Sequence, residues 1–158
     1  GLRGLFEYGV VHNPDDQIIK MIARGVRPIL AVAEKHRNIR RVLIAYNGSV
    51  EAARAMHLML HLSPFPDIET RIVTFDLPEK RAMPLLMDAA EYLRAHGLDP
   101  DIEPMEGPPR ERLLEHAGEW GADMIVMGST SRTRITRFLL GDTGLHAMRQ
   151  SEIPLLLA

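Results

Sequence analysis

From Arg41 to its last residue, the chain alternates short apolar runs with longer amphipathic, helix-type patterns. The run Met124–Met127 is apolar throughout, which is typical of a strand covered on both faces. Strands that alternate with helices of this length favour a parallel sheet with right-handed crossovers. We therefore expect an α/β fold, an open parallel five-stranded sheet with helices on both faces. The expected strands are residues 41–46, 69–75, 101–105, 124–127 and 154–157.

Turn formers and prolines set the expected helix boundaries. Asn47-Gly48 ends the first strand, and Ser49 is the expected N-cap of the helix that follows. A proline is tolerated near the start of a helix, so Pro84 predicts a second helix that begins close to Ala82 and runs to His96.

The overall composition narrows the classes of function. The 158 residues suffice for one well-packed domain, and a net charge of -2 argues against a nucleic-acid partner. No apolar run approaches the roughly 20 residues that cross a bilayer, so no membrane partner is expected. The sequence holds no cysteine, which excludes thiolate catalysis and fits a reducing, cytoplasmic location. No nucleophile–base pair, metal cluster or catalytic carboxylate pair emerges, so we expect a binding module and no enzyme.

The first 38 residues repeat the end of the chain. When Asp16 is aligned with Asp142, Pro28 meets Pro154 and the run Ile29–Val32 meets Leu155–Ala158 without a gap. Residues 1–38 are thus interpreted as the C-terminal remnant of a preceding domain, a helix plus an edge strand, and residues 39–158 as a complete domain. A lone helix and strand cannot bury their apolar faces. We therefore expect Ile29–Val32 to pair with Leu155–Ala158, within one chain or between the two copies of a homodimer.

The segment from Gly128 to Thr143 lies between a buried strand and a helix and is rich in Ser, Thr and Arg. Gly128 allows a ligand to approach the backbone, and the following helix directs unpaired N–H groups and its positive dipole end at the loop. These features suit a phosphate. The same residues also fit a solvated loop in which Asp142 is an ordinary N-cap, and the residues alone leave both interpretations open.

The segment from Arg41 to Ala158 resembles the universal stress protein family. That family has a loop of the form Gly-x2-Gly-x9-Gly after an apolar strand, and Gly128, Ser131 and Gly141 keep this spacing. The Asn47-Gly48-Ser49 turn also resembles the Asp-Gly-Ser turn of the family. The resemblance implies an adenine nucleotide alpha hydrolase-like fold that dimerises, often through the last strand. It also implies ATP binding in one branch, at the positions Asn47, Phe75, Met127, Gly128, Ser131, Gly141 and Asp142. Arg132, as a side-chain donor of the loop, and Thr143, beside Asp142, complete the candidate nucleotide-binding residues.

Three of these positions depart from the ATP-binding pattern: Asn47 replaces an aspartate, Ser131 a glycine, and Asp142 a serine or threonine. A carboxylate at position 142 repels a polyphosphate, at a cost of about 1–3 kcal/mol for one like-charge pair about 5 Å apart. Two functions lead, ahead of a weak ATPase or kinase-like activity that would need a Mg²⁺ site the sequence does not indicate. One is a small-ligand module of the stress response that binds ATP with Mg²⁺ or another adenine nucleotide. The other is a dimerisation or interaction module that binds no nucleotide.

Overall fold

The computed structural model describes residues 28–32, 36–62, 67–129 and 142–158. Within them lies a six-stranded sheet of order β1-β6-β5-β2-β3-β4. The strands are β1 (Ile29–Ala31), β2 (Arg41–Ala45), β3 (Glu69–Phe75), β4 (Asp101–Met105), β5 (Met124–Met127) and β6 (Leu155–Leu157), and the helices are α3 (Val50–Leu62), α4 (Glu79–Arg94), α5 (Pro109–Trp120) and α6 (Asp142–Gln150).

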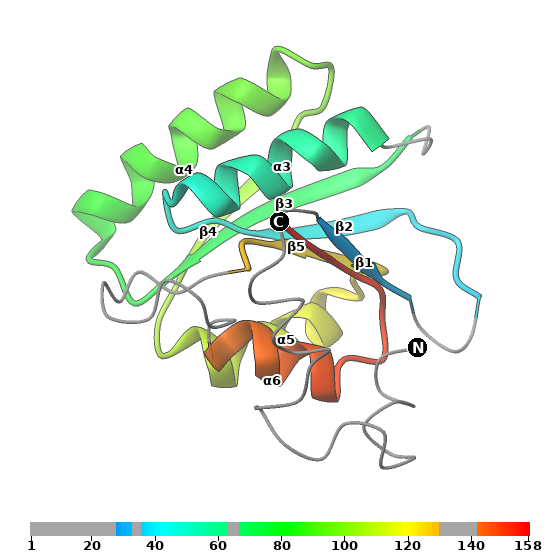
Figure 1. Ribbon diagram of the computed structural model, residues 1–158. Coiled ribbons are helices and arrows are strands. Elements are labelled where there is room, and N and C mark those ends of the chain that lie inside the picture. Colours follow the sequence, from blue (N-terminus) through cyan, green and yellow to red (C-terminus); the bar gives the residue numbers. More distant parts are fainter. Residues whose placement is uncertain (1–27, 33–35, 63–66, 130–141) are drawn as a thin grey trace.

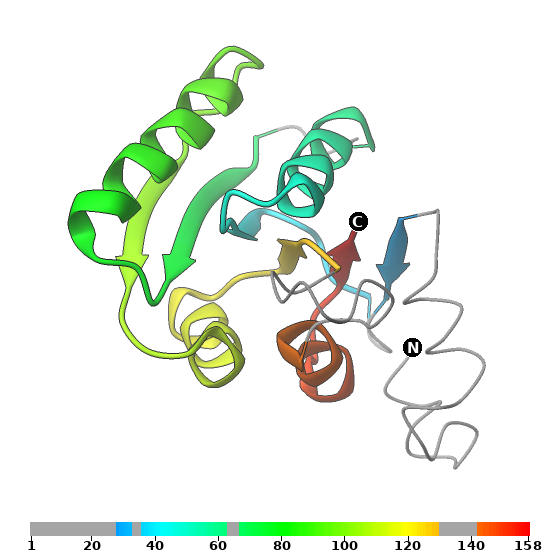
Figure 2. The same ribbon diagram turned by 60° about the vertical axis from the view of Figure 1, so that its left-hand side comes forward.

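Helices cover both faces of the sheet, α3 and α4 on one and α5 and α6 on the other (Figures 1 and 2). Side chains alternate across each strand, so β2 sends Leu43 into the core beneath α5 and α6 and sends Val42 and Ile44 into the core beneath α3 and α4. All three are fully buried. This two-sided burial explains why β2 and β5 are apolar along most of their length.

The α/β architecture with a parallel sheet is confirmed. Strands β2 to β6 are parallel to one another and form the expected five-stranded set. Strand β1 pairs with the edge of β6 in antiparallel orientation and is the sixth strand of the sheet. The helix expected before β1 falls within residues 1–27, which lie outside the described residues. No helix in the described ranges is long and apolar enough to cross a membrane.

The start of α4 differs from expectation, because the helix begins at Glu79 and not close to Ala82. The carbonyl of Pro78 accepts hydrogen bonds from the N–H groups of Arg81 and Ala82, at 2.7 and 3.0 Å, which begins the helix earlier. Pro84 therefore lies inside the helix. Its ring is on the exposed side, where water can solvate the carbonyl left without a partner one turn earlier.

Candidate ligand site

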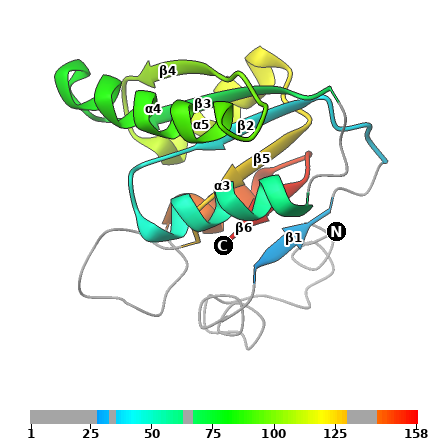
Figure 3. The same ribbon diagram turned by 90° about the horizontal axis from the view of Figure 1, so that it is seen from above.

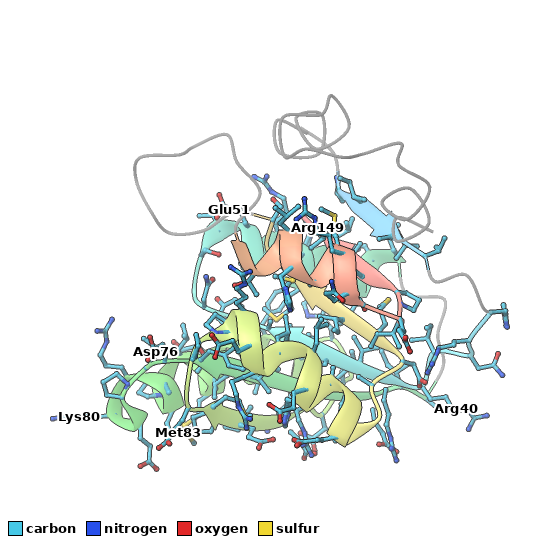
Figure 4. All side chains as sticks on the ribbon, turned by 90° about the horizontal axis from the view of Figure 1, so that it is seen from below. Arg40, Glu51, Asp76, Lys80, Met83 and Arg149 are labelled. Carbon is cyan, nitrogen blue, oxygen red and sulfur yellow. The ribbon has the colours of Figure 1, made fainter. Side chains whose placement is uncertain are left out.

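The candidate site lies beyond the carboxyl ends of β2 and β5. These strands are neighbours in the sheet, but the chain leaves them in opposite directions. From β2 it runs through α3 to β3, toward one edge of the sheet, and from β5 it runs through α6 to β6, toward the other edge. Ala45 and Met127 are partners at their last positions, so the chain leaves both strands at the same edge. Ligands of open α/β sheets bind at such a topological switch point. Figure 4 shows Glu51 and Asp76 toward this end of the molecule and Arg40 toward the other.

The turn after β2 is organised by its own polar side chains. The Asn47 Oδ1 atom accepts a hydrogen bond from the Ser49 N–H at 3.0 Å, and Gly48 between them has a φ of 73°. Ser49 Oγ accepts the N–H of Ala52 at 3.1 Å, which confirms Ser49 as the N-cap of α3. The predicted ligand residue Asn47 therefore also fixes the turn, and its exposed carboxamide retains further hydrogen-bonding capacity.

Gly128, directly after β5, packs against the first turn of α3. A Cβ atom at this position would come within 2.8 Å of the Ala52 backbone nitrogen and 3.0 Å of the Glu51 carbonyl carbon. The close backbone of α3 therefore requires a glycine at this position, whether or not a ligand also approaches it. Its neighbour Ser129 donates its N–H to the carbonyl of Ala158 at 2.8 Å. The start of the glycine loop is therefore held by α3 and by the end of β6.

The end of β3 contributes Phe75 and Asp76. Phe75 is half-buried and packs against the core beneath α5 and α6, so its aromatic ring is partly available at the carboxyl edge. Asp76 has a φ of 54°, and its N–H bonds to the carbonyl of Met105 at 3.2 Å. A non-glycine residue with positive φ at a strand end often marks a functional loop. Asp76 is not among the residues predicted for the site, because an aspartate before Leu77-Pro78 carries no distinctive signal.

The remaining predicted residues divide into three groups. Met127 is 7% exposed, so its side chain is buried, and its carbonyl accepts the N–H of Ala158 at 3.4 Å. Asp142 is the first residue of α6 and Thr143, the second, is half-buried. Ser131, Arg132 and Gly141 lie outside the described residues. The structure thus brings Asn47, Phe75, Gly128 and the start of α6 to one edge of the sheet.

Tyr46 is the titratable group next to this site with a shifted pKa. Burial raises the pKa of its hydroxyl above the ordinary 10.0, and the negative charge of Asp88 on α4 raises it further. The hydroxyl is therefore a neutral hydrogen-bonding group at physiological pH. Among the residues that the structure describes, no group of three His, Asp or Glu side chains is placed to hold a metal ion.

The fold defines a class of open α/β domain with a mostly parallel sheet, and comparison identifies its family. The model of the universal stress protein family matches residues 38–158, from the start of β2 through the glycine loop to the last strand. The chain belongs to this family.

Curated relatives include two proteins that match most of this chain. The stress response protein NhaX of Bacillus subtilis is 29% identical over 139 residues, which cover 86% of this chain and 83% of that protein. The universal stress protein Slr1230 of Synechocystis is 25% identical over 158 residues, which cover 99% of this chain and 54% of that protein. The chain thus spans about half the length of the Synechocystis relative.

Solved structures share the fold. A universal stress protein in complex with cAMP superposes with a TM-score of 0.63 at 22% identity, over 77% of this chain and 98% of that one. A universal stress protein family protein from Arabidopsis thaliana with AMP bound has a TM-score of 0.58 at 13% identity, over 75% of this chain and 90% of that one.

Proposed function

We propose that this chain is a cytoplasmic stress-response module that binds an adenine nucleotide at the candidate site and catalyses no reaction. The observation that carries the proposal is the paired exit of β2 and β5 at the switch point, where the Asn47 turn and Gly128 leave the sheet side by side. Two proteins of the same fold are described with cAMP and with AMP, which supports adenine as the base.

The number of phosphates is limited by the start of α6. Asp142 is the first residue of that helix, where unpaired N–H groups and the helix dipole attract an anion. A carboxylate at this position of the sequence would repel added phosphates. The ligand proposed is therefore a nucleotide with one phosphate, AMP or cAMP, bound more tightly than ATP with Mg²⁺.

Isothermal titration calorimetry of the chain with AMP, cAMP and ATP·Mg²⁺ tests both statements. We expect binding heat with AMP or cAMP and weaker binding of ATP. Replacing the carboxylate by its amide in Asp142→Asn should tighten ATP binding by about tenfold, the effect of removing one like-charge contact. The control Glu119→Gln removes an exposed charge from the far end of α5 and should change nothing.

The outcomes separate the two statements. No heat with any of the three nucleotides at near-millimolar concentration would overturn the nucleotide proposal. Binding of ATP that Asp142→Asn leaves unchanged would overturn the charge argument alone.

A dimerisation module without a nucleotide is the second candidate. Asn47 Oδ1 already accepts the Ser49 N–H, so the turn has a structural role that needs no ligand. A homodimer through Leu155–Ala158 would require β1 to leave the edge of β6 or to be exchanged between copies, because β1 occupies that edge. Sedimentation of the chain over a range of concentrations tests it, and a monomer throughout would exclude this dimer.

A further inference from the structure

Two histidines lie one helical turn apart near the end of α3. His57 and His61 are both exposed, and their ring centroids are 4.2 Å apart with an angle of 73° between the ring planes. The chain has seven histidines, and these two are the pair separated by a single helical turn. Residues four apart project from the same side of a helix, and this spacing places two histidines of one helix on a zinc ion in metalloproteases.

Spacing by itself does not distinguish a ligand pair from a solvated helix face, but His57 also has a partner on the neighbouring helix. Helix α3 runs along β5 and β6, and α4 runs along β3 and β4 (Figure 3). Tyr92 of α4 connects the two helices, because its hydroxyl is hydrogen-bonded to Nδ1 of His57 at 2.7 Å. This bond occupies Nδ1 and leaves Nε2 as the nitrogen of His57 that can bind a ligand.

A hydrogen bond at one imidazole nitrogen is the usual arrangement of a histidine that binds metal through the other, because it fixes the tautomer and the orientation of the ring. With a metal on Nε2, the Nδ1–H group of His57 donates to the Tyr92 oxygen. Two nitrogens bound to one tetrahedral ion at about 2.0–2.1 Å place the ring centroids about 5 Å apart, roughly 1 Å more than the 4.2 Å seen here. His61 is exposed in the last turn of α3, so its side chain can make this movement without a shift of the helix.

The charges around the pair are compatible with a bound cation. His61 lies at the C-terminal end of α3, where the negative end of the helix dipole stabilises positive charge. Arg54, one turn before His57, is exposed, so water and salt screen its repulsion of a cation. In the described ranges no third His, Asp or Glu joins such a pair, so the remaining coordination positions belong to water.

We propose that His57 and His61 bind a divalent transition-metal ion, with Tyr92 as the residue that positions His57. Imidazole ligands suit Cu(II), Zn(II) and Ni(II), and the general order of metal affinities makes Cu(II) the tightest. The ion joins two turns of α3 and, through Tyr92, holds the end of this helix against α4. The proposal does not rest on nucleotide binding, because the candidate ligand site is at the opposite end of α3, beside Ser49.

Isothermal titration of the untagged 158-residue chain with Cu(II) and with Zn(II) tests the site. The variants are H57N, H61N and the double variant, and the exposed positions should leave the urea midpoint without metal close to that of the wild type. Each single change should lower Cu(II) affinity by about tenfold or more, at least the effect of losing a residue that supports a ligand. The two losses should not add, since either change already breaks the chelate.

Tyr92→Phe keeps both ligands and removes the hydroxyl that positions His57. Cu(II) affinity should fall by about tenfold. The electron paramagnetic resonance spectrum should still show two nitrogen ligands, a signature that the loss of either histidine removes. Unchanged affinity in this variant would overturn the positioning role of Tyr92.

The matched control is H96N. His96 is exposed on the other side of Tyr92, with ring centroids 4.6 Å apart, and its Nδ1 is hydrogen-bonded to the Tyr92 carbonyl oxygen at 2.8 Å. Its replacement should leave Cu(II) affinity unchanged, and a loss as large as that in H57N would overturn the assignment of the pair. Equal Cu(II) affinity in the wild type and in the double variant of His57 and His61 would overturn the site itself.

Discussion

Tyr46 connects a buried strand to the candidate site and makes the stability of the protein sensitive to alkaline pH. Its pKa is raised above 10.0 by burial and by Asp88, so the folded chain holds the phenolic proton more tightly than the unfolded chain does. This contribution to stability is complete below pH 10.0 and is lost as the pH rises through the folded-state value. Tyr46→Phe removes it.

We therefore expect the urea midpoint of the wild type to fall more steeply above about pH 10 than that of Tyr46→Phe. Midpoints measured from neutral to alkaline pH check this, and the comparison at neutral pH corrects for the lost hydroxyl. Two curves that run parallel through the alkaline range would contradict it.

At single residues, local chemistry was predictable and tertiary contacts were not. Ser49 was predicted as an N-cap because a hydroxyl before a helix has few other local roles, and the structure confirms it. The positive φ of Asp76 results from the path of the chain from β3 to α4, and the limited availability of Met127 results from its packing in the core. Neither property follows from the residue type.

The close contact between the end of β5 and the first turn of α3 depends on the absence of a side chain at Gly128. Gly128→Ala places a Cβ atom 2.8 Å from the Ala52 nitrogen, where only backbone can yield, so α3 must shift. We expect a loss of about 1–3 kcal/mol in the free energy of unfolding, as for other overpacked positions. Chemical denaturation measures it.

The matched control is Gly118→Ala inside α5, where a Cβ atom meets nothing within 4 Å. There the change should stabilise the protein by roughly 0.5–1 kcal/mol through helix propensity. Equal effects of the two substitutions would show that the contact with α3 does not constrain Gly128.

Among the elements, the strands were predicted best because period and burial both mark them. Asp101–Met105 was expected as a strand, and it forms β4 with those bounds. The predicted start of α4 was wrong by three residues. The prediction placed Pro84 near the helix start because a proline inside a helix leaves one carbonyl without its hydrogen bond. Pro84 is on the exposed face of α4, where water can bind that carbonyl. For the glycine loop, the residues left a phosphate site and a solvated loop both open, and residues 130–141 lie outside the described part.

For the molecule as a whole, β1 and the ligand site are connected through β6. Strand β1 pairs with β6, and the carbonyl of Ala158 at the end of β6 accepts the N–H of Ser129 at the start of the glycine loop. The N-terminal segment therefore stabilises the strand that holds one side of the site. If the proposed nucleotide binds there, its affinity should depend on whether β1 is docked.

Ala31→Asp tests this dependence. Ala31 is 9% exposed in the core beneath α5 and α6, and a buried unpaired carboxylate there should detach β1 and loosen β6. We expect AMP affinity to fall roughly fivefold or more, the lower end of typical coupling between sites. The control is Leu30→Asp, whose side chain is 55% exposed on the same strand and which should leave affinity unchanged. Hydrogen exchange at Leu157, whose backbone faces β1 opposite Ile29, reports whether β1 has detached. Detachment without loss of affinity would show that the β1 edge and the ligand site are independent.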